Sequence, residues 1–442
     1  RGLCLWQIWL IFNHQLLTYF TSVVNRKNVR SYPHLTRFAS PIYSRRHMKF
    51  YNKMAVVVLA TSGLVLSSSP AFAGQINGSG ATFAQPLIDV CKVEFTKDTG
   101  HTINYTAGGS GKGRTDFTNN LVDFAASDAV YTSGFPANLE YAPVYAAPIA
   151  IFYNLPTVKE PINLTAATVA QIFGGQITKW NDPQIISDNQ KRTIKTPVYK
   201  TKQEVVTVGG KKVTKTVPVL DKNGKPTVLR TTSKTVDITL PSTPITVYYR
   251  TDSSGTSEQF GKYLQGTNAG ANADLWPKTA SGTFANSTPI NLSTVFNFQG
   301  ASGSALVAQG VKDKIGGVGY GELSWATDNK LAVANIVNQA GEAVAPSSAG
   351  TSAFLGGGTI QANGSLVADY KKVITGAYSI GTASYGLVYP EAAKKNAETQ
   401  KIVAAWHTYL LEQCPKKFPE KGYVALTGPL YDKAKEQIAK IK

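Results

Sequence analysis

Apolar and polar residues follow two different periods along the chain, and their order predicts an α/β protein. Residues 84–95 carry apolar side chains at helical spacing, whereas 102–105 form a short strand-like run. A glycine-rich turn, a helical pattern at 112–120 and a second strand-like run at 122–128 follow. A strand, a glycine turn, a helix and another strand in this order are typical of a parallel βαβ unit.

Two further segments predict strands that cross between domains. Residues 144–153 form an apolar run, and 377–389 form a second strand-like segment near the end of the chain, before helical patterns at 401–411 and 431–441. The chain from Gly74 onward is longer than the roughly 250–300 residues that one hydrophobic core supports. We therefore expect two α/β domains.

The segment 193–240 has a different pattern from the rest. Val, Thr and Lys alternate with a period of two, and Gly209-Gly210 and Asn223-Gly224 provide turns. This pattern predicts an inserted basic β-ribbon that projects from the body of the protein. Its lysines favour a solvated face, and a polyanion-binding or adhesive surface is the alternative interpretation.

The first 73 residues are not expected to belong to the folded domains, and part of them has the pattern of a targeting signal. Residues 48–53 are basic, 55–66 are apolar, and Ala71-Phe72-Ala73 fits the small-x-small cleavage rule, so 48–73 is expected to be a secretory signal peptide. Its apolar core is shorter than the roughly 20 residues of a membrane-spanning helix. Residues 1–47 contain no Met and are expected to be a non-structural or mistranslated upstream segment. We expect a periplasmic or secreted protein.

The net charge of +18 is confined to two regions. Residues 1–73 carry +9 and residues 191–234 carry +10, so the remainder is close to neutral. A neutral body does not favour a nucleic-acid partner. Two cysteines, Cys91 and Cys414, follow the predicted signal peptide. Export permits a disulfide between them, and two buried free thiols are an equally acceptable interpretation.

Three short turns rich in Gly, Ser and Thr provide candidate chemistry. They cover 78–83, 108–113 and 252–257, and each leads into a predicted helix. The start of a helix offers unpaired backbone N–H groups and the positive end of the helix dipole, and glycine lets an oxyanion approach that backbone closely. One such turn usually only caps a helix, but three turns together with Arg250 predict an anion cage.

The residue types of the cage favour a protonated oxyanion. Hydroxyl groups, backbone amides and the planar guanidinium of Arg250 all donate hydrogen bonds. Asp128, at the end of a predicted strand, is a carboxylate that can only accept. Phosphate near neutral pH carries a proton to donate and sulfate does not, so Asp128 would discriminate between them. Asp252 is expected to hold the guanidinium in place. Taken singly, these residues are also compatible with helix caps and a surface ion pair.

These motifs resemble a known family. The segments 78–83, 105–113, 122–128, 172–182 and 250–256, with Gly317–Glu322, are similar to the periplasmic phosphate-binding proteins of bacterial ABC-type phosphate uptake systems, which have the type II periplasmic binding protein fold. Gly111-Lys112 departs from the family pattern, and Lys112 is expected either to strengthen anion attraction or to face solvent.

The resemblance implies the architecture and the site. It implies two lobes with mixed sheets flanked by helices, 74–148 plus 381–442 and 149–380, joined by two hinge strands. The implied contacts to phosphate are Thr82, Phe83, Ser110, Asp128, Arg250, Ser254, Gly255 and Thr256, with Asp252 acting on the arginine. We expect a monomer that hands inorganic phosphate to transporter permease subunits, with no cofactor and no metal.

An anion cage is also compatible with two other functions. A phosphoryl-transfer enzyme would need a metal cluster or an activated nucleophile, and His101 and His407 are the only histidines after the predicted signal peptide. We therefore expect no enzymatic activity. The other alternative is a secreted phosphate-binding scaffold whose basic ribbon serves surface or polyanion adhesion.

Overall fold

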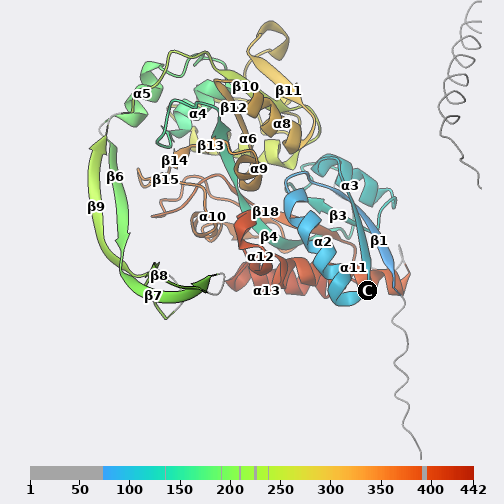
Figure 1. Ribbon diagram of the computed structural model, residues 1–442. Helices are drawn as coiled ribbons and strands as arrows, with labels where there is room; N and C mark the ends of the chain where they lie inside the picture. Colours follow the sequence, from blue (N-terminus) through green and yellow to red (C-terminus); the bar gives the residue numbers. More distant parts are fainter. Residues whose placement is uncertain are drawn as a thin grey trace, which may run out of the picture. The chain divides into compact units, whose positions relative to one another are not determined.

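The computed structural model describes residues 73–134, 136–190, 192–208, 211–222, 226–236, 238–390 and 396–442 (Figure 1). The contacts divide the chain into residues 1–67 and 68–442, and all described residues belong to the second part. The upstream segment 1–47 and the predicted signal peptide, apart from Ala73, lie outside the described residues. Within the described ranges, no helix has the length and apolar character needed to cross a bilayer.

A mixed nine-stranded sheet organises the fold. Its strands follow the order β11-β10-β12-β4-β18-β3-β1-β2, with β13 paired to β4. β1 is parallel to β2 and β3, as the predicted βαβ unit requires, and β10 is parallel to β11 and β12. The strands are β1 Gln75–Gly80, β2 Thr102–Ala107, β3 Phe124–Ser127, β4 Glu140–Tyr153, β10 Thr246–Arg250, β11 Phe298–Ala301, β12 Gly317–Glu322, β13 Ala332–Val333 and β18 Gly381–Val388.

The long strand β4 joins the two parallel groups. Residues 140–148 pair antiparallel with β18, and 149–153 pair antiparallel with β12. The run predicted at 144–153 is thus the second part of β4, which is buried from Tyr141 onward. β18 begins at Gly381, so the prediction of a strand from residue 377 started four residues too early. Tyr378, just before β18, donates its hydroxyl to the carbonyl of Ile149 at 2.9 Å.

The strands β1–β3 run antiparallel to β10–β12, because β4 pairs antiparallel with both β12 and β18, and β18 pairs antiparallel with β3. The carboxyl ends of the two groups therefore point toward each other along β4. Four helices follow parallel strands directly, two in each group. They are α2 Gln85–Thr99 after β1, α3 Ser110–Thr118 after β2, α6 Gly255–Thr267 after β10 and α8 Gly303–Asp313 after β11. The other helices are α4 Ala166–Phe173, α5 Pro183–Asn189, α7 Phe284–Ser287, α9 Leu323–Asp328, α10 Ser348–Leu355, α11 Ala397–Glu412, α12 Cys414–Lys417 and α13 Gly428–Ile438, with short 3-10 turns η1 Ala273–Leu275, η2 Leu292–Thr294 and η4 Pro419–Lys421. Two small sheets contain β5 Asn163–Leu164, β14 Asn335–Val337 and β15 Ala343–Val344, and β16 Thr359–Ile360 with β17 Leu366–Val367.

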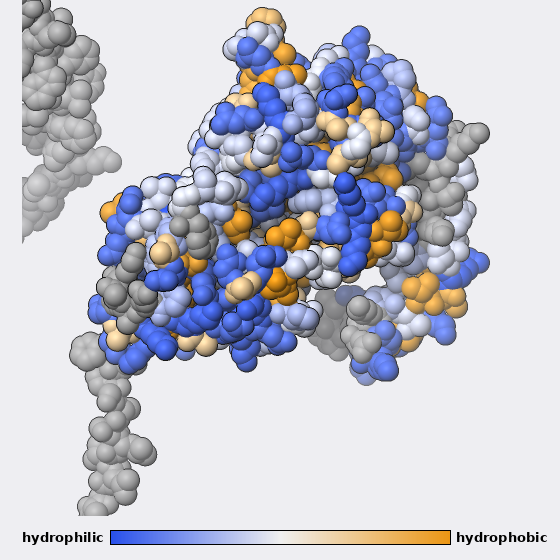
Figure 2. Space-filling model, turned by 180° about the vertical axis from the view of Figure 1, so that it is seen from behind, coloured by the Kyte–Doolittle hydropathy of each residue, from blue (hydrophilic) through white to orange (hydrophobic). Residues whose placement is uncertain are grey.

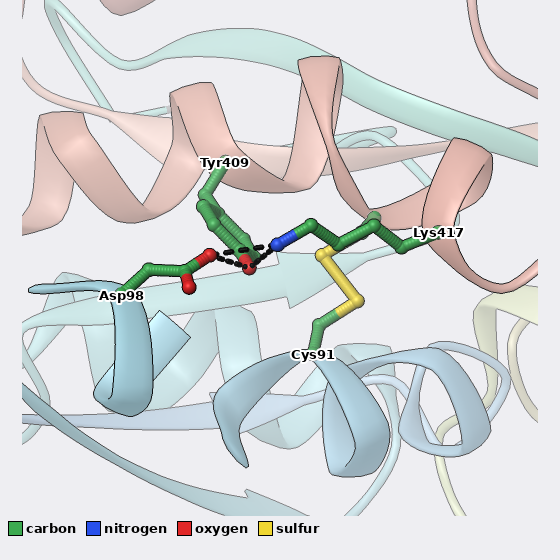
Figure 3. The surroundings of a disulfide bond; sticks show 5 residues. Cys91, Asp98, Tyr409 and Lys417 are labelled. Atoms are coloured by element: carbon green, nitrogen blue, oxygen red, sulfur yellow. Dashed lines mark hydrogen bonds and ion pairs between the residues drawn. A yellow bond between two sulfur atoms is a disulfide. The ribbon is translucent and has the colours of Figure 1, made fainter. Parts of the chain in front are cut away.

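A disulfide connects the first and last parts of the fold. Cys91 of α2 is bonded to Cys414 of α12, with the two Cα atoms 5.8 Å apart (Figure 3). Beside it, Asp98 accepts hydrogen bonds from Tyr409 and Lys417, both at 2.7 Å. Of the two interpretations of the cysteines, the structure selects the disulfide, which closes a loop of more than 300 residues.

The segment 192–236 consists of paired antiparallel strands. β6 Arg192–Tyr199 pairs with β9 Val228–Val236, and β7 Thr201–Val208 pairs with β8 Lys211–Pro218. The predicted turns at 209–210 and 223–224 lie outside the described residues.

Candidate functional site

The carboxyl ends of the parallel strands bring the three predicted turns together. Within each parallel group the strands end at a common edge, and the edges of the two groups face each other along β4. The crevice outside the carboxyl ends of strands is where open α/β sheets bind ligands. A Cβ atom built on Gly255, the first residue of α6, would lie 2.4 Å from Ser110 Oγ and 3.0 Å from Asp128 Cβ. One built on Gly109 would lie 2.5 Å from Asp252 Oδ2. The glycines therefore allow backbone contacts between turns that are far apart in the sequence.

Two hydrogen bonds hold these turns against each other. The backbone N–H of Gly111 donates to the carbonyl of Ser253 at 2.9 Å. The Gln259 side chain of α6 donates to the carbonyl of Asp128, also at 2.9 Å. The N-terminal ends of α3 and α6, which are the positive ends of the helix dipoles, therefore lie beside Asp128. Two such helix ends close together favour the binding of an anion.

The predicted pairing of Arg250 with Asp252 is present and buried. Arg250 is 2% exposed, its Nε donates to Asp252 Oδ1 at 2.6 Å, and its Nη2 donates to Oδ2. Burial pushes the pKa of Asp252 upward, but the hydrogen bonds and charge of Arg250 and the N–H of Gly303 hold it below its ordinary value. This bidentate pair fixes the plane of the guanidinium and leaves Nη1 for other partners.

Asp128 is the buried acceptor of the site. It is 1% exposed, and its Oδ1 accepts from Ser384 at 2.9 Å while Oδ2 lies 3.4 Å from the Ser110 hydroxyl. Burial raises the pKa of Asp128 to about 7, and the Ser384 hydrogen bond and the charge of Arg250 limit that rise. The carboxyl group therefore changes its charge near neutral pH.

The structure describes the contacts of three further predicted residues. Ser254 caps α6, since its Oγ accepts from the Ser257 N–H at 3.1 Å, which agrees with the simpler interpretation of that serine. Thr256 Oγ1 is buried and has no hydrogen-bond partner in the part of the chain that the structure describes. The Phe83 carbonyl accepts from the Tyr423 hydroxyl at 2.5 Å, and the Phe83 side chain is fully buried. An unpartnered buried hydroxyl marks a place where a ligand can complete the hydrogen bonding.

Lys112 does not add a free positive charge to the site. Its Nζ lies 2.6 Å from Asp116 Oδ2, one helical turn along α3, and the Ser79 hydroxyl donates to the same oxygen at 2.7 Å. The departure at Gly111-Lys112 is thus accommodated by a local ion pair.

Two serines of the site were missed by the sequence analysis. Ser304 of α8 accepts from Arg250 Nη1 at 2.9 Å and lies 3.0 Å from Thr82 Oγ1. It follows Gly300-Ala301-Ser302-Gly303, a turn of the same composition as the three predicted ones, so the signal was available. Ser384 lies within β18, and a single serine in a strand gives no such signal.

Comparison with known proteins identifies the family. The PBP superfamily domain matches residues 67–413. Phosphate-binding protein PstS2 of Mycobacterium bovis (strain BCG / Pasteur 1173P2) is 31% identical over 353 residues, covering 75% of this chain and 79% of the relative. The chain belongs to the PstS family of phosphate-binding proteins. Phosphate-binding protein PstS of Xylella fastidiosa (strain Temecula1 / ATCC 700964) is 28% identical over 362 residues, or 80% of this chain and 81% of that protein.

Solved structures support the same fold. A high-affinity periplasmic phosphate-binding protein (PfluDING) bound with phosphate has a TM-score of 0.56 at 20% identity, covering 82% of this chain and 93% of that one. The ancestral soluble variant of the human phosphate-binding protein has a TM-score of 0.57 at 20% identity, covering 81% and 92%. At this identity the similarity shows the fold alone, which is the predicted type II periplasmic binding protein fold.

Proposed function

We propose that the protein binds inorganic phosphate at the buried site of Asp128 and Arg250 and delivers it to an ABC-type transporter. The observation that supports this proposal most strongly is the position of the Asp128 carboxylate. It lies near the Ser110 hydroxyl, the first residue of α6 and the positive charge of Arg250. A site of donors alone would accept any small oxyanion. One buried acceptor favours an anion that has a proton to donate.

The proposed ligand contacts are those that the sequence predicts. They are Thr82, Phe83, Ser110, Asp128, Arg250, Ser254, Gly255 and Thr256, with Asp252 orienting the guanidinium. The unpartnered hydroxyl of Thr256 supports a ligand at this position, because a buried hydroxyl without a partner costs free energy. The bidentate Arg250–Asp252 pair supports a fixed arginine rather than a mobile surface charge.

Closure of two lobes is the proposed signal to the transporter. The proposed lobes are 74–148 with 381–442 and 149–380, and the site draws residues from both. Thr82 with Ser304 and Gly111 with Ser253 form hydrogen bonds across this division. A ligand held from both sides favours the closed arrangement, which permease subunits can recognise. Since one chain supplies both halves, we propose that it acts as a monomer, exported to the cell surface or periplasm.

Binding without bond cleavage is part of the proposal. The relatives described above are named as binding proteins, and Ser110 and Ser254 form hydrogen bonds with a carboxylate and a backbone amide rather than with a histidine. Incubation with a chromogenic phosphate ester, with and without divalent metals, tests this directly. Turnover that Arg250→Ala removes would show that the site is catalytic.

Calorimetric titration with phosphate and sulfate tests the proposed ligand. We expect phosphate to bind much more tightly than sulfate, Arg250→Ala to weaken both, and Asp128→Asn to bring the two affinities closer together because an amide can donate to sulfate. Asp123→Asn, a change to a half-buried carboxylate on the same segment that accepts from the Asn77 N–H at 2.8 Å, serves as the control. An unchanged ratio in Asp128→Asn would contradict the role of Asp128, and an absence of phosphate binding in the wild-type protein would overturn the proposal.

A further inference from the structure

The segment between β6 and β9 contains a surface that phosphate binding does not use. β6 pairs only with β9 and β7 only with β8 among the described strands, so each pair is a two-stranded sheet. A two-stranded sheet without further cover is of marginal stability in water, because it buries little apolar surface. Such a ribbon gains stability when another surface covers it.

A ring of backbone hydrogen bonds forms a bend between the two strand pairs. Lys200 N–H donates to the Thr227 carbonyl at 2.8 Å, Thr227 N–H donates to the Val219 carbonyl at 2.7 Å, and Val219 N–H donates to the Lys200 carbonyl at 2.8 Å. Three chain segments therefore meet at one point. The strand register also shifts there, between Val198 and Tyr199, which is typical of a β-bulge.

The bend exposes large apolar side chains from all three segments. Tyr199 is 42% exposed, Leu220 55%, and the consecutive residues Val228 and Leu229 are 49% and 57% exposed. Tyr199 and Val228 are direct cross-strand partners, and Leu220 forms a β-bridge with Pro226. We call Tyr199, Leu220, Val228 and Leu229 the apolar bend. Val205 of β7 is also 62% exposed, so the apolar bend is the place where several such side chains gather rather than the sole exposed apolar part of the ribbon. A group of exposed apolar side chains favours an interaction site.

Exposed cations lie next to the apolar bend in the chain, together with one exposed carboxylate, Asp221. These cations are Lys200, Lys222 and Arg230. Lys202, Lys212 and Lys215 are exposed on β7 and β8, where Glu204 lies 3.6 Å from Lys202 Nζ. In Figure 2, which turns the ribbon to the right-hand side, hydrophobic and hydrophilic groups lie next to each other there. The exposed cations Lys200, Lys222 and Arg230 thus lie next to exposed apolar residues in the chain.

We propose that this ribbon docks on the surface of a lipid bilayer rich in anionic headgroups. The cations would lie among the headgroups, and the apolar bend would enter the boundary with the acyl chains. A bilayer matches both features at once. A soluble polyanion or a nucleic acid would match the cations, but it would leave Leu220, Val228 and Leu229 exposed to water. The ribbon would then hold the protein at the membrane surface, independently of whether the site binds phosphate.

Vesicle co-sedimentation tests this proposal. The purified protein is mixed with vesicles of phosphatidylglycerol and phosphatidylcholine, or of phosphatidylcholine alone. We expect binding to the anionic vesicles that weakens at least tenfold in high salt, and no binding to the neutral ones. Leu220→Ser with Leu229→Ser should weaken binding about tenfold, and Lys200→Gln with Lys222→Gln and Arg230→Gln should weaken it at least as much, because each set removes one of the two attractions.

Matched changes elsewhere provide the controls. Leu306→Ser alters a side chain that is also 57% exposed, and Lys401→Gln alters an exposed cation of α11, so neither should change vesicle binding. Phosphate titration of every variant verifies the fold. Failure to bind anionic vesicles, or wild-type binding by the Leu220 and Leu229 variant, would overturn the proposal. Binding to soluble polyphosphate that depends on the cations but not on the apolar bend would instead assign the ribbon to polyanions.

Discussion

The hydroxyl oxygens of Thr82 and Ser304 lie 3.0 Å apart, although the two residues are 222 positions apart in the sequence. The backbone N–H of Ser304 also donates to Thr82 Oγ1 at 3.2 Å, and Arg250 Nη1 donates to Ser304 Oγ at 2.9 Å. Ser304 therefore connects the turn after β1 to the arginine at the end of β10. It stabilises the relative positions of two proposed ligand contacts.

Removal of the Ser304 hydroxyl should weaken phosphate binding. In Ser304→Ala the arginine loses the hydrogen bond that holds Nη1, and a bond to a charged group contributes about 1.5–3 kcal/mol, so we expect at least a tenfold loss of affinity. Calorimetry measures this loss. Ser302→Ala is the matched control, because Ser302 is exposed and makes no side-chain capping bond to α8. Equal affinities for Ser304→Ala and the control would show that Arg250 is held by Asp252 alone.

The affinity for sulfate should rise as the pH falls through about 7. The pKa of Asp128 is raised to about 7 by burial, so its carboxyl group is charged above that pH and protonated below it. A protonated carboxyl group can donate to sulfate, whereas the carboxylate repels it. Sulfate itself does not titrate in this range, so the change reports on the protein. Asp128→Asn should bind sulfate with no such dependence on pH.

Ser384 should set the pH at which this change occurs. Its hydroxyl donates to Asp128 Oδ1 and so lowers the pKa of that carboxyl group, together with the charges of Arg250 and Arg114. In Ser384→Ala the pKa rises, and sulfate binding should extend to higher pH. Thr382→Val is the control, since the Thr382 hydroxyl lies near the Asp128 carbonyl rather than its carboxylate. Superimposable pH curves for wild type and Ser384→Ala would argue against this role.

The local parts of the site could be predicted from the sequence because each depends on residues that are close together. The turns at 108–113 and 252–257 lead into α3 and α6 as their glycines and serines predict, and Asp252 pairs with Arg250 two positions away. The sequence could not show which strands lie next to each other in the sheet. Ser384 reaches Asp128 because β18 pairs with β3, with Tyr385 opposite Ser127.

Hydrophobic patterning also has a limit that β18 illustrates. Ala377, Tyr378 and Ile380 are as deeply buried as the strand that follows, yet they form no strand. Burial produces a run of apolar residues both in the loop before β18 and in the strand itself. The hydrophobic pattern therefore cannot locate the first residue of the strand. The cysteines show the same limit: their sequence positions allowed a disulfide or two thiols, and only the packing of α2 against α12 decides between them.

Loss of the disulfide should lower stability without abolishing binding. Removing a native disulfide typically costs about 2–5 kcal/mol, and the bond between Cys91 and Cys414 constrains a very long loop of the unfolded chain. We expect Cys91→Ala with Cys414→Ala to unfold at lower denaturant concentration while keeping phosphate affinity within a factor of about two. Reduction of the wild-type protein should reproduce the change. A double variant as stable as wild type would mean that the contacts of Asp98 with Tyr409 and Lys417 suffice.

A side chain added at Gly255 should weaken phosphate binding without destabilising the phosphate-free protein. A Cβ there would lie 2.4 Å from Ser110 Oγ, 3.0 Å from the Ala129 amide nitrogen and 3.0 Å from Asp128 Cβ. Because Ser110 Oγ already accepts from the Asp128 N–H at 3.1 Å, it cannot move away without losing that bond. Overpacking of this kind costs about 1–3 kcal/mol, which corresponds to a loss of phosphate affinity of about fivefold or more in Gly255→Ala.

The phosphate-free protein should tolerate the same change better. If the proposed lobes open without phosphate, α6 and the turn at Ser110 separate and the added methyl group meets no neighbour. We therefore expect the unfolding temperature of phosphate-free Gly255→Ala to stay near that of wild type, while the increase on adding phosphate is reduced. Gly282→Ala, whose Cβ would come no closer than 3.4 Å to its neighbours, should behave like wild type in both measurements. An equal loss of stability with and without phosphate would show that Gly255 and Ser110 stay in contact throughout.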